Sequence, residues 1–396
     1  MSAPTPLNAR RPVSVDVAVV GSGPAGSALS ILLADSGINV MMIDETGRPR
    51  REFGECLPAA AKPMLTTLGL WSQFLRDGHL PCYGTRSYWG SDEARELDYR
   101  EESLDCSWHL DRYVFNGMLL ARARALGVSV CSPTRITGVE RKKDGTWRLA
   151  LTSPQDQWMS KARFVVDASG TSSSFASRLG VNRRVKDRLV VLSSILEGPM
   201  GHRDKDPDTY STVEAVDSGW WYSALVPENR RIASFITDAD LVSKKAPIGK
   251  HWLAKLKSSV WTRNHLKSHG YQMGSGPNWR HAGSSRLDQF SGKGWLAVGD
   301  AAFACDPLCS QGITGPLLSA FHAKDTITTL FRGNHEALAS YAGLMDLTFE
   351  DYLALRGSIY TRENRWPKTS FWTRRRKTTP QTADSGLPQL IPYSLG

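Results

Sequence analysis

The sequence predicts an α/β fold in which a Rossmann-like domain carries an inserted antiparallel sheet and ends in a helical, basic C-terminal tail. Three observations lead to this prediction. An apolar strand, a glycine-rich turn and a helix follow one another from Val15 to Asp44. From Arg188 to Asp238 successive strands are separated by turns. The alternation of strands and helices then resumes at Gly294.

The glycine-rich turn reads Gly-Ser-Gly-Pro-Ala-Gly and joins the first strand to the first helix. Gly21 permits the tight turn, Gly23 lets the backbone approach a pyrophosphate, and Gly26 lets helix and strand pack closely. The helix N-terminus offers free N–H groups and a positive dipole end to phosphates. A second apolar strand ends at Asp44, whose carboxylate can accept hydrogen bonds from a ribose. The pattern predicts a dinucleotide site formed by Gly21, Gly23, Pro24, Ala25, Gly26, Asp44 and Glu45.

Two later motifs fall at the ends of apolar strands and make the nucleotide specific. Asp167-Ala-Ser-Gly closes one buried strand, and Gly299-Asp300 closes another. Folds of the α/β class place ligands at the carboxyl ends of their strands, where an acid can bind the ribityl hydroxyls of a flavin. A helix beginning near Gly312 offers a second N-terminus, which can hold negative charge on a reduced flavin ring. Together the motifs predict FAD, held in this half by Asp167, Gly299, Asp300, Gly312, Ile313 and Thr314.

Composition and charge exclude several classes of protein. The chain has 396 residues, of which 41% are hydrophobic, and no run of about 18 apolar residues could span a membrane. Its six cysteines lack the spacing of a disulfide framework or a metal site. We therefore expect a cytoplasmic protein with reduced thiols and no metal. The net charge is +10 without a nucleic-acid-binding motif, so we expect neither nucleic acid nor a membrane as partner.

Half of the net charge lies near the C-terminus. From Thr361 to Gly396 seven basic residues stand against two acidic ones, which gives +5. The same segment carries Trp366, Phe371 and Trp372. One interpretation is a solvated or self-packing tail, and the other is a site for an acidic protein partner.

Periodicity and turn signals divide the chain into segments. Residues 57–70 read as a helix, and Asp111 is expected to cap a helix that runs to Gly127. Lys143-Asp144-Gly145 predicts a hairpin turn. We expect the FAD-binding domain in three parts, 13–80, 109–185 and 281–345. The substrate domain would comprise a segment at 81–108 and the antiparallel sheet at 186–280, and residues 346–396 would form the C-terminal helix and basic tail.

At this point the sequence resembles a known superfamily over roughly residues 13 to 360. It is similar to the single-component FAD-dependent monooxygenases of the p-hydroxybenzoate hydroxylase type, with their tryptophan halogenase and geranylgeranyl reductase relatives. The resemblance implies that Arg112, which opens the helix after Asp111, contacts the cofactor. It also places Gly54-Glu55-Cys-Leu-Pro beside the flavin. Residues 365–375 resemble a C-terminal pattern of the flavoproteins that hydroxylate tryptophan during maturation of quinone-cofactor amine dehydrogenases and oxidases.

This resemblance implies a chemistry carried by the cofactor. Reduced flavin would react with O2 to form a C4a-hydroperoxide that hydroxylates an aromatic ring, which we expect to be an indole or tryptophan ring. Transient NAD(P)H or a separate flavin reductase would supply the electrons, because the chain has only one dinucleotide motif. Glu55 and Trp221 are the candidate catalytic residues. The competing interpretations are a helix-terminal acid for Glu55 and a core residue for Trp221.

Four other functions stay open at the level of sequence. A halogenase of this superfamily needs a lysine, but residues 79–100 contain none. The Trp220-Trp221 pair also lacks the spacing of the halogenase signature. The other possibilities are a hydroxylase of small aromatic molecules, a flavin-dependent prenyl reductase and a non-catalytic flavin-binding protein. The substrate could equally be a polypeptide that carries the target tryptophan and docks on the basic tail.

Overall fold

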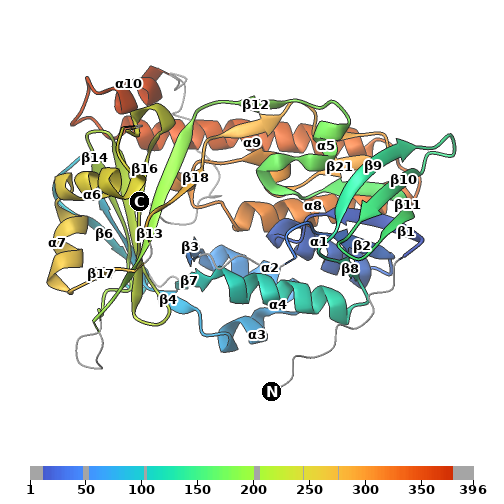
Figure 1. The fold of residues 1–396 in the computed structure, drawn as a ribbon, viewed down its shortest axis with the longest axis horizontal. Coiled ribbons are helices and arrows are strands. Elements are labelled where there is room, and N and C mark those ends of the chain that lie inside the picture. The colour runs from blue at the N-terminus through green and yellow to red at the C-terminus, as the bar shows by residue number, and fades with distance from the viewer. Residues whose placement is uncertain are drawn as a thin grey trace.

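The structure is a computed structural model that describes residues 12–47, 53–101, 105–199, 206–243, 245–274 and 276–377. For residues 53–55 and 377 it describes the backbone alone. Figure 1 shows two sheets side by side, with a long C-terminal helix running along both. The predicted α/β class with a second sheet is confirmed. Within the described residues no helix is long and apolar enough to cross a membrane.

The first sheet has a parallel core whose strands end at one edge. In the order β20-β21-β11-β1-β2-β8, every pair but the outermost β20–β21 is parallel. Val20 pairs with both Asp167 and Ile43, so three strand ends meet. A hairpin, β9 and β10, extends β11 antiparallel. The strands are Ser14–Val20 (β1), Val40–Ile43 (β2), Ser129–Cys131 (β8), Arg135–Arg141 (β9), Trp147–Thr152 (β10), Gln157–Asp167 (β11), Ser291–Gly292 (β20) and Trp295–Ala297 (β21).

The second sheet contains the expected antiparallel run and is extended by an earlier segment. Its order is β17-β13-β16-β15-β14-β5-β6, with β18 also paired to β13. Because β14 pairs with β5 in parallel, the sheet is mixed, which the sequence pattern did not predict. Its strands are Gly84–Tyr88 (β5), Arg95–Asp98 (β6), Leu189–Glu197 (β13), Ser211–Val216 (β14), Gly219–Val226 (β15), Arg230–Asp238 (β16), Gln272–Met273 (β17) and Asn278–His281 (β18).

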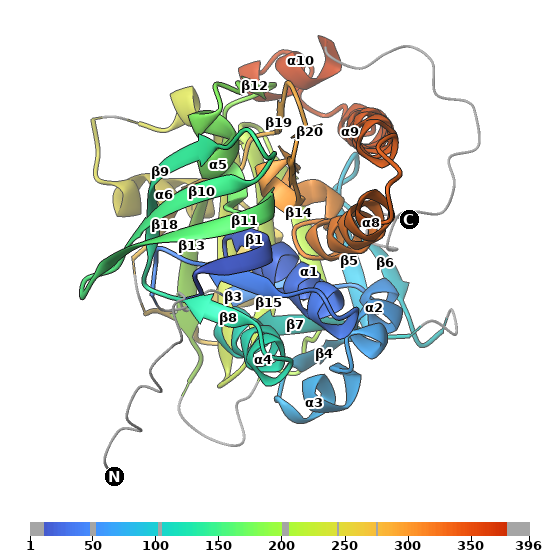
Figure 2. The same ribbon diagram turned by 90° about the vertical axis from the view of Figure 1, so that its right-hand side faces the viewer.

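Two three-stranded sheets and the helices complete the fold (Figure 2). The small sheets have the orders β3-β7-β4 and β12-β19-β22, and consist of Phe53–Leu57 (β3), Leu80–Cys82 (β4), Ser107–Asp111 (β7), Arg183–Val185 (β12), Ser285–Leu287 (β19) and Phe303–Ala304 (β22). The helices are Pro24–Asp35 (α1), Lys62–Thr67 (α2), Trp71–Arg76 (α3), Arg112–Ala125 (α4), Ser174–Arg178 (α5), Ile248–Ser258 (α6), Trp261–Ser268 (α7), Thr314–Phe331 (α8), Ala337–Thr361 (α9) and Ser370–Lys377 (α10).

Local signals in the sequence had mixed success. The Asp111 carboxylate accepts hydrogen bonds from the N–H groups of Tyr113 and Val114, so the predicted cap of α4 is confirmed. The hairpin at residues 143–145 is confirmed as well. The helix expected over 57–70 is wrong at its start, because Leu57 ends strand β3 and Pro58 follows it in an extended conformation. A proline there delays the helical turns.

The C-terminal segment packs on the protein's own body. Phe371 and Trp372 of α10 are 1% and 0% exposed, in a cluster with residues of α9 and the second sheet. The indole of Trp366 stacks on that of Trp372. Arg374 and Arg375 both form ion pairs with Asp238. Phe371, Trp372 and Arg375 are therefore core residues and not free anchors for an acidic partner, whereas Trp366 is half-buried and Lys368 is exposed. Residues 378–396 lie outside the description.

Candidate functional site

A large cavity lies where the carboxyl ends of the parallel strands face the second sheet. Its volume is about 1810 Å³, larger than the 300–1,000 Å³ usual for a drug-sized ligand. One part is lined by the turn after β1 and the end of β2, and the other by side chains from β13, β14, β15 and β16. The cavity has room for a dinucleotide and a second molecule.

The glycine motif has the shape of a pyrophosphate cradle. A Cβ atom at Gly21 would lie 2.2 Å from the carbonyl oxygen of Ala168, and φ there is +113°. A Cβ at Gly26 would lie 2.1 Å from the carbonyl oxygen of Gly21. A Cβ at Gly23, in contrast, would meet nothing within 4 Å. Gly23 lines the cavity and is the N-cap residue of α1, where no side chain occupies the first N–H groups of the helix. Two glycines thus shape the turn, and the third leaves space for phosphates beside the helix N-terminus.

Asp44 is held as an ionised acceptor at the end of β2. One carboxylate oxygen accepts a 2.6 Å hydrogen bond from the Ser22 hydroxyl, and the other accepts one of 2.7 Å from Thr46. Burial alone would raise its pKa, but these hydrogen bonds outweigh burial, and the pKa of Asp44 is lowered. A carboxylate fixed beside the glycine turn can accept hydrogen bonds from a ribose diol, as the sequence predicts.

Asp300 faces the other half of the cavity from a short helical turn at residues 299–301. Burial raises its pKa to about 6, although the positive charges of Arg183 and Arg112 act in the opposite direction. The Arg183 guanidinium donates to the backbone carbonyl of Asp300 at 2.7 Å, which fixes the turn. The carboxyl group therefore sits in a poorly solvated site within reach of two positive charges. It can exchange hydrogen bonds with a polyol chain there.

The helix N-terminus predicted near Gly312 also lies at the cavity. Helix α8 begins at Thr314, and its cap residue, Ile313, gives no side-chain hydrogen bond to the first turn. Gly312 and Ile313 line the cavity, and a Cβ at Gly312 would meet no atom within 4 Å. Arg112 lines the same cavity from the start of α4. A positive dipole end and a cation thus both face the cavity.

Several predicted residues support the cavity without lining it. Gly26, Gly299 and Thr314 belong to this group. A Cβ at Gly299 would lie 2.9 Å from the Cβ of Ala25, so this glycine permits the close packing of α1. The contact predicted for Asp167 is not supported by the structure. Its carboxylate is fully buried and accepts hydrogen bonds from the backbone of residues 169, 175 and 176, which holds the turn into α5.

Of the two candidate catalytic residues, Trp221 lies on the face of its strand that points away from the cavity. It is 0% exposed and packs against Phe235 and Trp252, away from the cavity. Side chains alternate along a strand, so its neighbours Trp220 and Tyr222 line the cavity instead. The side chain of Glu55 lies outside the described residues, and only its backbone in β3 is placed. Its proposed role stays a prediction.

The wall of the cavity formed by the second sheet was not predicted from the sequence. Apolar and aromatic residues cover it, together with a few hydroxyl groups: Val191, Ser193, Ile195, Ser211, Val213, Trp220, Tyr222, Ile232, Ser234 and Ile236. No lysine is among the described residues that line the cavity. Lys62 lies on the surface and pairs with Asp105 at 2.8 Å. Period-two alternation could have found these residues, but which face of the sheet meets the cavity depends on the tertiary fold.

Comparison with known families identifies the class of protein. Residues 14–342 match the family described as FAD binding domain. The chain belongs to this family. It is an FAD-dependent oxidoreductase of the monooxygenase and halogenase superfamily, and its cofactor is FAD. The cradle at Gly23, the carboxylate of Asp44 and the acid of Asp300 fit the diphosphate, ribose and ribityl groups of that cofactor.

Individual relatives show how the family varies. The chain is 27% identical to the FAD-dependent oxidoreductase LodB of Marinomonas mediterranea, over 91% of this chain and 97% of the relative. It is 23% identical to the tryptophan 2-halogenase of Chondromyces crocatus, over 91% and 70% of the two chains. Among solved structures, the flavin-dependent halogenase CmlS aligns with a TM-score of 0.82 at 22% identity, covering 94% of this chain and 68% of that one.

A further structural neighbour has a more specific name. It is the peptidyl tryptophan dihydroxylase QhpG, which is essential for tryptophylquinone cofactor biogenesis. The alignment has a TM-score of 0.72 at 24% identity and covers 91% of this chain and 78% of that one. At these identities the solved structures establish the shared fold alone.

Proposed function

We propose that this protein hydroxylates an aromatic ring, with FAD and O2 as co-reactants. The observation that carries the proposal is the wall of the cavity on the second sheet. Tyr222 lies on this wall among aliphatic residues beside the largely buried Trp220, and the described lining residues include no lysine. An aromatic substrate fits such a wall by stacking and apolar contact. A halogenase of this superfamily needs a lysine in the site, and the described part of the cavity offers none.

The residues of the chain would bind the flavin and keep the site dry. The bound flavin supplies the activated oxygen, with electrons from transient NAD(P)H or a separate reductase. The first turn of α1 and Asp44 would hold the ADP half, while Asp300 and Arg112 would hold the flavin half. The N-terminus of α8 would stabilise negative charge on the reduced ring. The buried wall of the second sheet would exclude water from the reacting ring.

For the substrate we propose an indole, presented as a tryptophan side chain. Support comes from two relatives whose names state what they act on. QhpG is a peptidyl tryptophan dihydroxylase. A brominase from Pseudoalteromonas luteoviolacea, 26% identical over 83% of this chain, acts on a pyrrole-2-carbonyl group held by a peptidyl carrier protein. The basic C-terminal segment gives this proposal little support, because Phe371 and Trp372 are buried in the core.

Halogenation is the second candidate, since several relatives carry the name halogenase. One assay separates the candidates. The FAD-loaded enzyme, with a flavin reductase, NADH and saturating chloride or bromide, is given free tryptophan, indole or a tryptophan-containing peptide. Hydroxylation adds about 16 Da per oxygen atom inserted. A product that carries chlorine or bromine would overturn the proposal, and a product with only about 2 Da added would indicate a reductase. Turnover of the free indoles but not of the peptide would reject the polypeptide substrate.

A further inference from the structure

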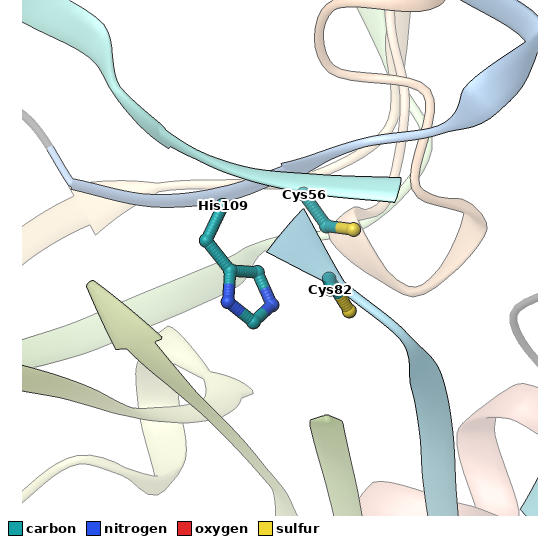
Figure 3. Close-up of side chains that lie close together, drawn as sticks. All are labelled: Cys56, Cys82 and His109. Atoms are coloured by element: carbon teal, nitrogen blue, oxygen red, sulfur yellow. The ribbon is translucent and has the colours of Figure 1, made fainter. Parts of the chain in front are cut away.

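Two cysteines and a histidine from distant parts of the chain meet at the end of the cavity. The small sheet β3-β7-β4 brings them together (Figure 3). Cys56 on β3 lies opposite His109 on β7, while Cys82 on β4 lies opposite Ser107. The two sulfur atoms and a ring nitrogen of His109 all lie within 4.8 Å of one another. Cys82 and His109 are 0% exposed, whereas Cys56 is partly exposed and lines the cavity.

We propose that Cys56, Cys82 and His109 bind one thiophilic metal ion, Zn²⁺, with its fourth coordination position open to the cavity. Two thiolates and an imidazole are donors that zinc prefers, and three protein ligands with one open position form a common tetrahedral arrangement. Ligand atoms around zinc lie about 2.0–2.3 Å from the ion. Around a tetrahedral ion such ligand atoms lie about 3.3–3.8 Å from one another, so binding would draw the three atoms together from their present separations of up to 4.8 Å.

The sheet geometry favours a shared ion over a disulfide bond. Cys56 and Cys82 lie on the two outer strands, with β7 between them. Neighbouring strands are about 4.8 Å apart, which puts the two outer strands roughly 9–10 Å apart, and the register offsets Cys56 from Cys82 by a further two residues along β7. A disulfide requires a Cα separation of about 4.4–6.8 Å. The thiols therefore approach each other above β7 at a backbone separation too large for a disulfide bond.

The surroundings of the cluster are more polar than an apolar core would be. The Ser211 hydroxyl lies 2.9 Å from His109 Nε2 and 3.6 Å from Cys82 Sγ. Among the described residues, His109 Nδ1 and the hydroxyl of Tyr222 are buried without a hydrogen-bond partner. Buried polar atoms are nearly always satisfied in native proteins. Polar groups gathered around two thiols at a cavity wall are better explained by a bound ion and its water than by packing alone.

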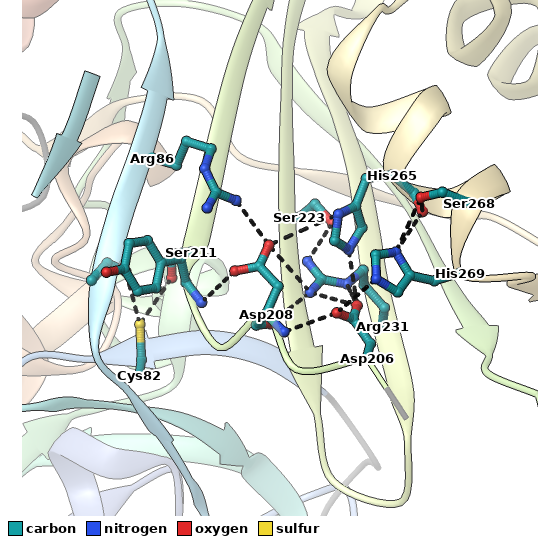
Figure 4. A network of polar contacts seen from close by, with 12 residues as sticks. Cys82, Arg86, Asp206, Asp208, Ser211, Ser223, Arg231, His265, Ser268 and His269 are labelled. Carbon is teal, nitrogen blue, oxygen red and sulfur yellow. Dashed lines mark hydrogen bonds and ion pairs between the residues drawn. The ribbon is translucent and has the colours of Figure 1, made fainter. Parts of the chain in front are cut away.

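A second group of possible ligands shows what a site closed to metal looks like. Asp206, His265 and His269 also bring ligand atoms within 4.8 Å of one another (Figure 4). There the Arg231 guanidinium already forms an ion pair with the Asp206 carboxylate at 2.8 Å. Because the positive charge of Arg231 already neutralises the Asp206 carboxylate, we assign no metal to this second group. In the thiol cluster, the hydrogen bonds recorded among the described residues join Cys82 to the Gly84 carbonyl and the Ser211 hydroxyl, and His109 to the same hydroxyl. None of them comes from an arginine or a lysine.

The test measures metal content and ligand field on the full-length protein, independently of turnover. Purified protein is stripped with a chelator, reloaded with Zn²⁺ or Co²⁺ and desalted. We expect about one Zn²⁺ per chain, and a Co²⁺ spectrum with thiolate charge-transfer bands and strong d–d bands in the red, beyond the absorption of oxidised flavin. Cys82→Ser and His109→Ala should each lower bound metal at least about tenfold. Cys305→Ser is the matched control, because Cys305 lines the same cavity outside the cluster.

A second measurement needs no variant and covers the case in which a substituted protein fails to fold. Wild-type protein with and without Zn²⁺ is alkylated, and the modified cysteines are identified by peptide mass spectrometry. Zn²⁺ should protect Cys56 while leaving the alkylation of Cys305 unchanged. Less than about one tenth of an equivalent of Zn²⁺ in the wild type, or equal Co²⁺ spectra in wild type and Cys82→Ser, would overturn the proposal. So would alkylation of Cys56 at the same rate with and without Zn²⁺.

Discussion

The guanidinium of Arg375 and the carboxylate of Asp238 form a two-pronged ion pair, with N–O distances of 2.9 and 3.2 Å, that fastens α10 to the end of β16. Both side chains are less than a tenth exposed. Trp372, three residues earlier in α10, donates its indole N–H to the carbonyl of Val216 at 2.8 Å. Of the interpretations that the composition left open, self-packing is thus the one that α10 follows, with Arg374 and Arg375 paired within the chain.

Trp372→Ala should therefore destabilise the whole fold. The side chain is fully buried among aromatic residues, and removing a buried tryptophan costs about 3–5 kcal/mol. Urea denaturation followed by fluorescence would measure the loss. Lys368→Ala, in the same segment but exposed, should change stability by less than about 0.5 kcal/mol. If both variants unfold at the wild-type urea concentration, α10 is not part of the cooperative unit.

The three glycines of the first turn should respond differently to alanine. At Gly21 and Gly26 a Cβ would overlap backbone oxygens at 2.2 and 2.1 Å, so both variants should lose stability with or without FAD. At Gly23 the Cβ enters open cavity, so Gly23→Ala should keep the melting temperature of the FAD-free protein. Its FAD affinity should fall at least about tenfold, because the methyl group takes space needed by the pyrophosphate. Thermal scans of apoprotein and FAD titrations would measure the two effects separately.

These motifs also show how far sequence could go. A strand, a glycine turn and an acid are contiguous in the chain, so their chemistry can be read before the structure is known. Gly21, Gly23 and Asp44 accordingly line the cavity as expected. Asp167 differs because a strand-end acid can bind either a ligand or the loop that follows it. Hydrogen bonds from the backbone of Phe175 and Ala176 decide in favour of the loop, and no spacing rule predicts them.

Asp300→Asn should change the pH dependence of stability in the FAD-free protein. Burial raises the folded-state pKa of Asp300 to about 6 from its ordinary value of 3.8. The unfolded chain therefore loses this proton at lower pH than the folded chain does. The favourable contribution of the protonated carboxyl is complete below about pH 4 and is lost as pH rises to about 6. Asparagine does not titrate, so the variant should gain stability relative to wild type across that window and keep a constant difference above it.

Melting temperatures measured from pH 4 to 8 in both proteins test this expectation. The exposed acid Glu140 provides the control. The Glu140→Gln variant keeps Asp300, so its melting temperature should still show the loss between pH 4 and 6 that Asp300 produces. Parallel pH profiles for wild type and Asp300→Asn would mean that the carboxyl group is not shielded from solvent. In that case a poorly solvated site would not explain the hydrogen bonds proposed between this group and the flavin chain.

The limits of sequence are clearest where residues come from distant segments. Cys56, Cys82 and His109 are more than 25 residues apart along the chain, so their spacing suggested scattered thiols and no metal. Only the pairing of β3 and β4 with β7 brings them together. The same holds for β15. Alternation predicts that neighbouring side chains face opposite sides, but it does not say which side meets the cavity.

Trp221 and Tyr222 provide the final prediction, because adjacent residues of β15 should have separable roles. Trp221→Ala removes a side chain packed between Phe235 and Trp252, so it should cost about 3–5 kcal/mol of stability. Its turnover per folded, FAD-loaded molecule should remain near wild type.

Tyr222→Phe removes only a buried hydroxyl at the cavity wall, which has no hydrogen-bond partner among the described residues. Stability should hold or rise slightly, since an unsatisfied polar atom is lost, while kcat/KM for an aromatic substrate should change severalfold. Urea denaturation and steady-state kinetics on both variants distinguish the two effects, and a loss of kcat in folded Trp221→Ala without a loss in Tyr222→Phe would reverse the assignment of the two faces.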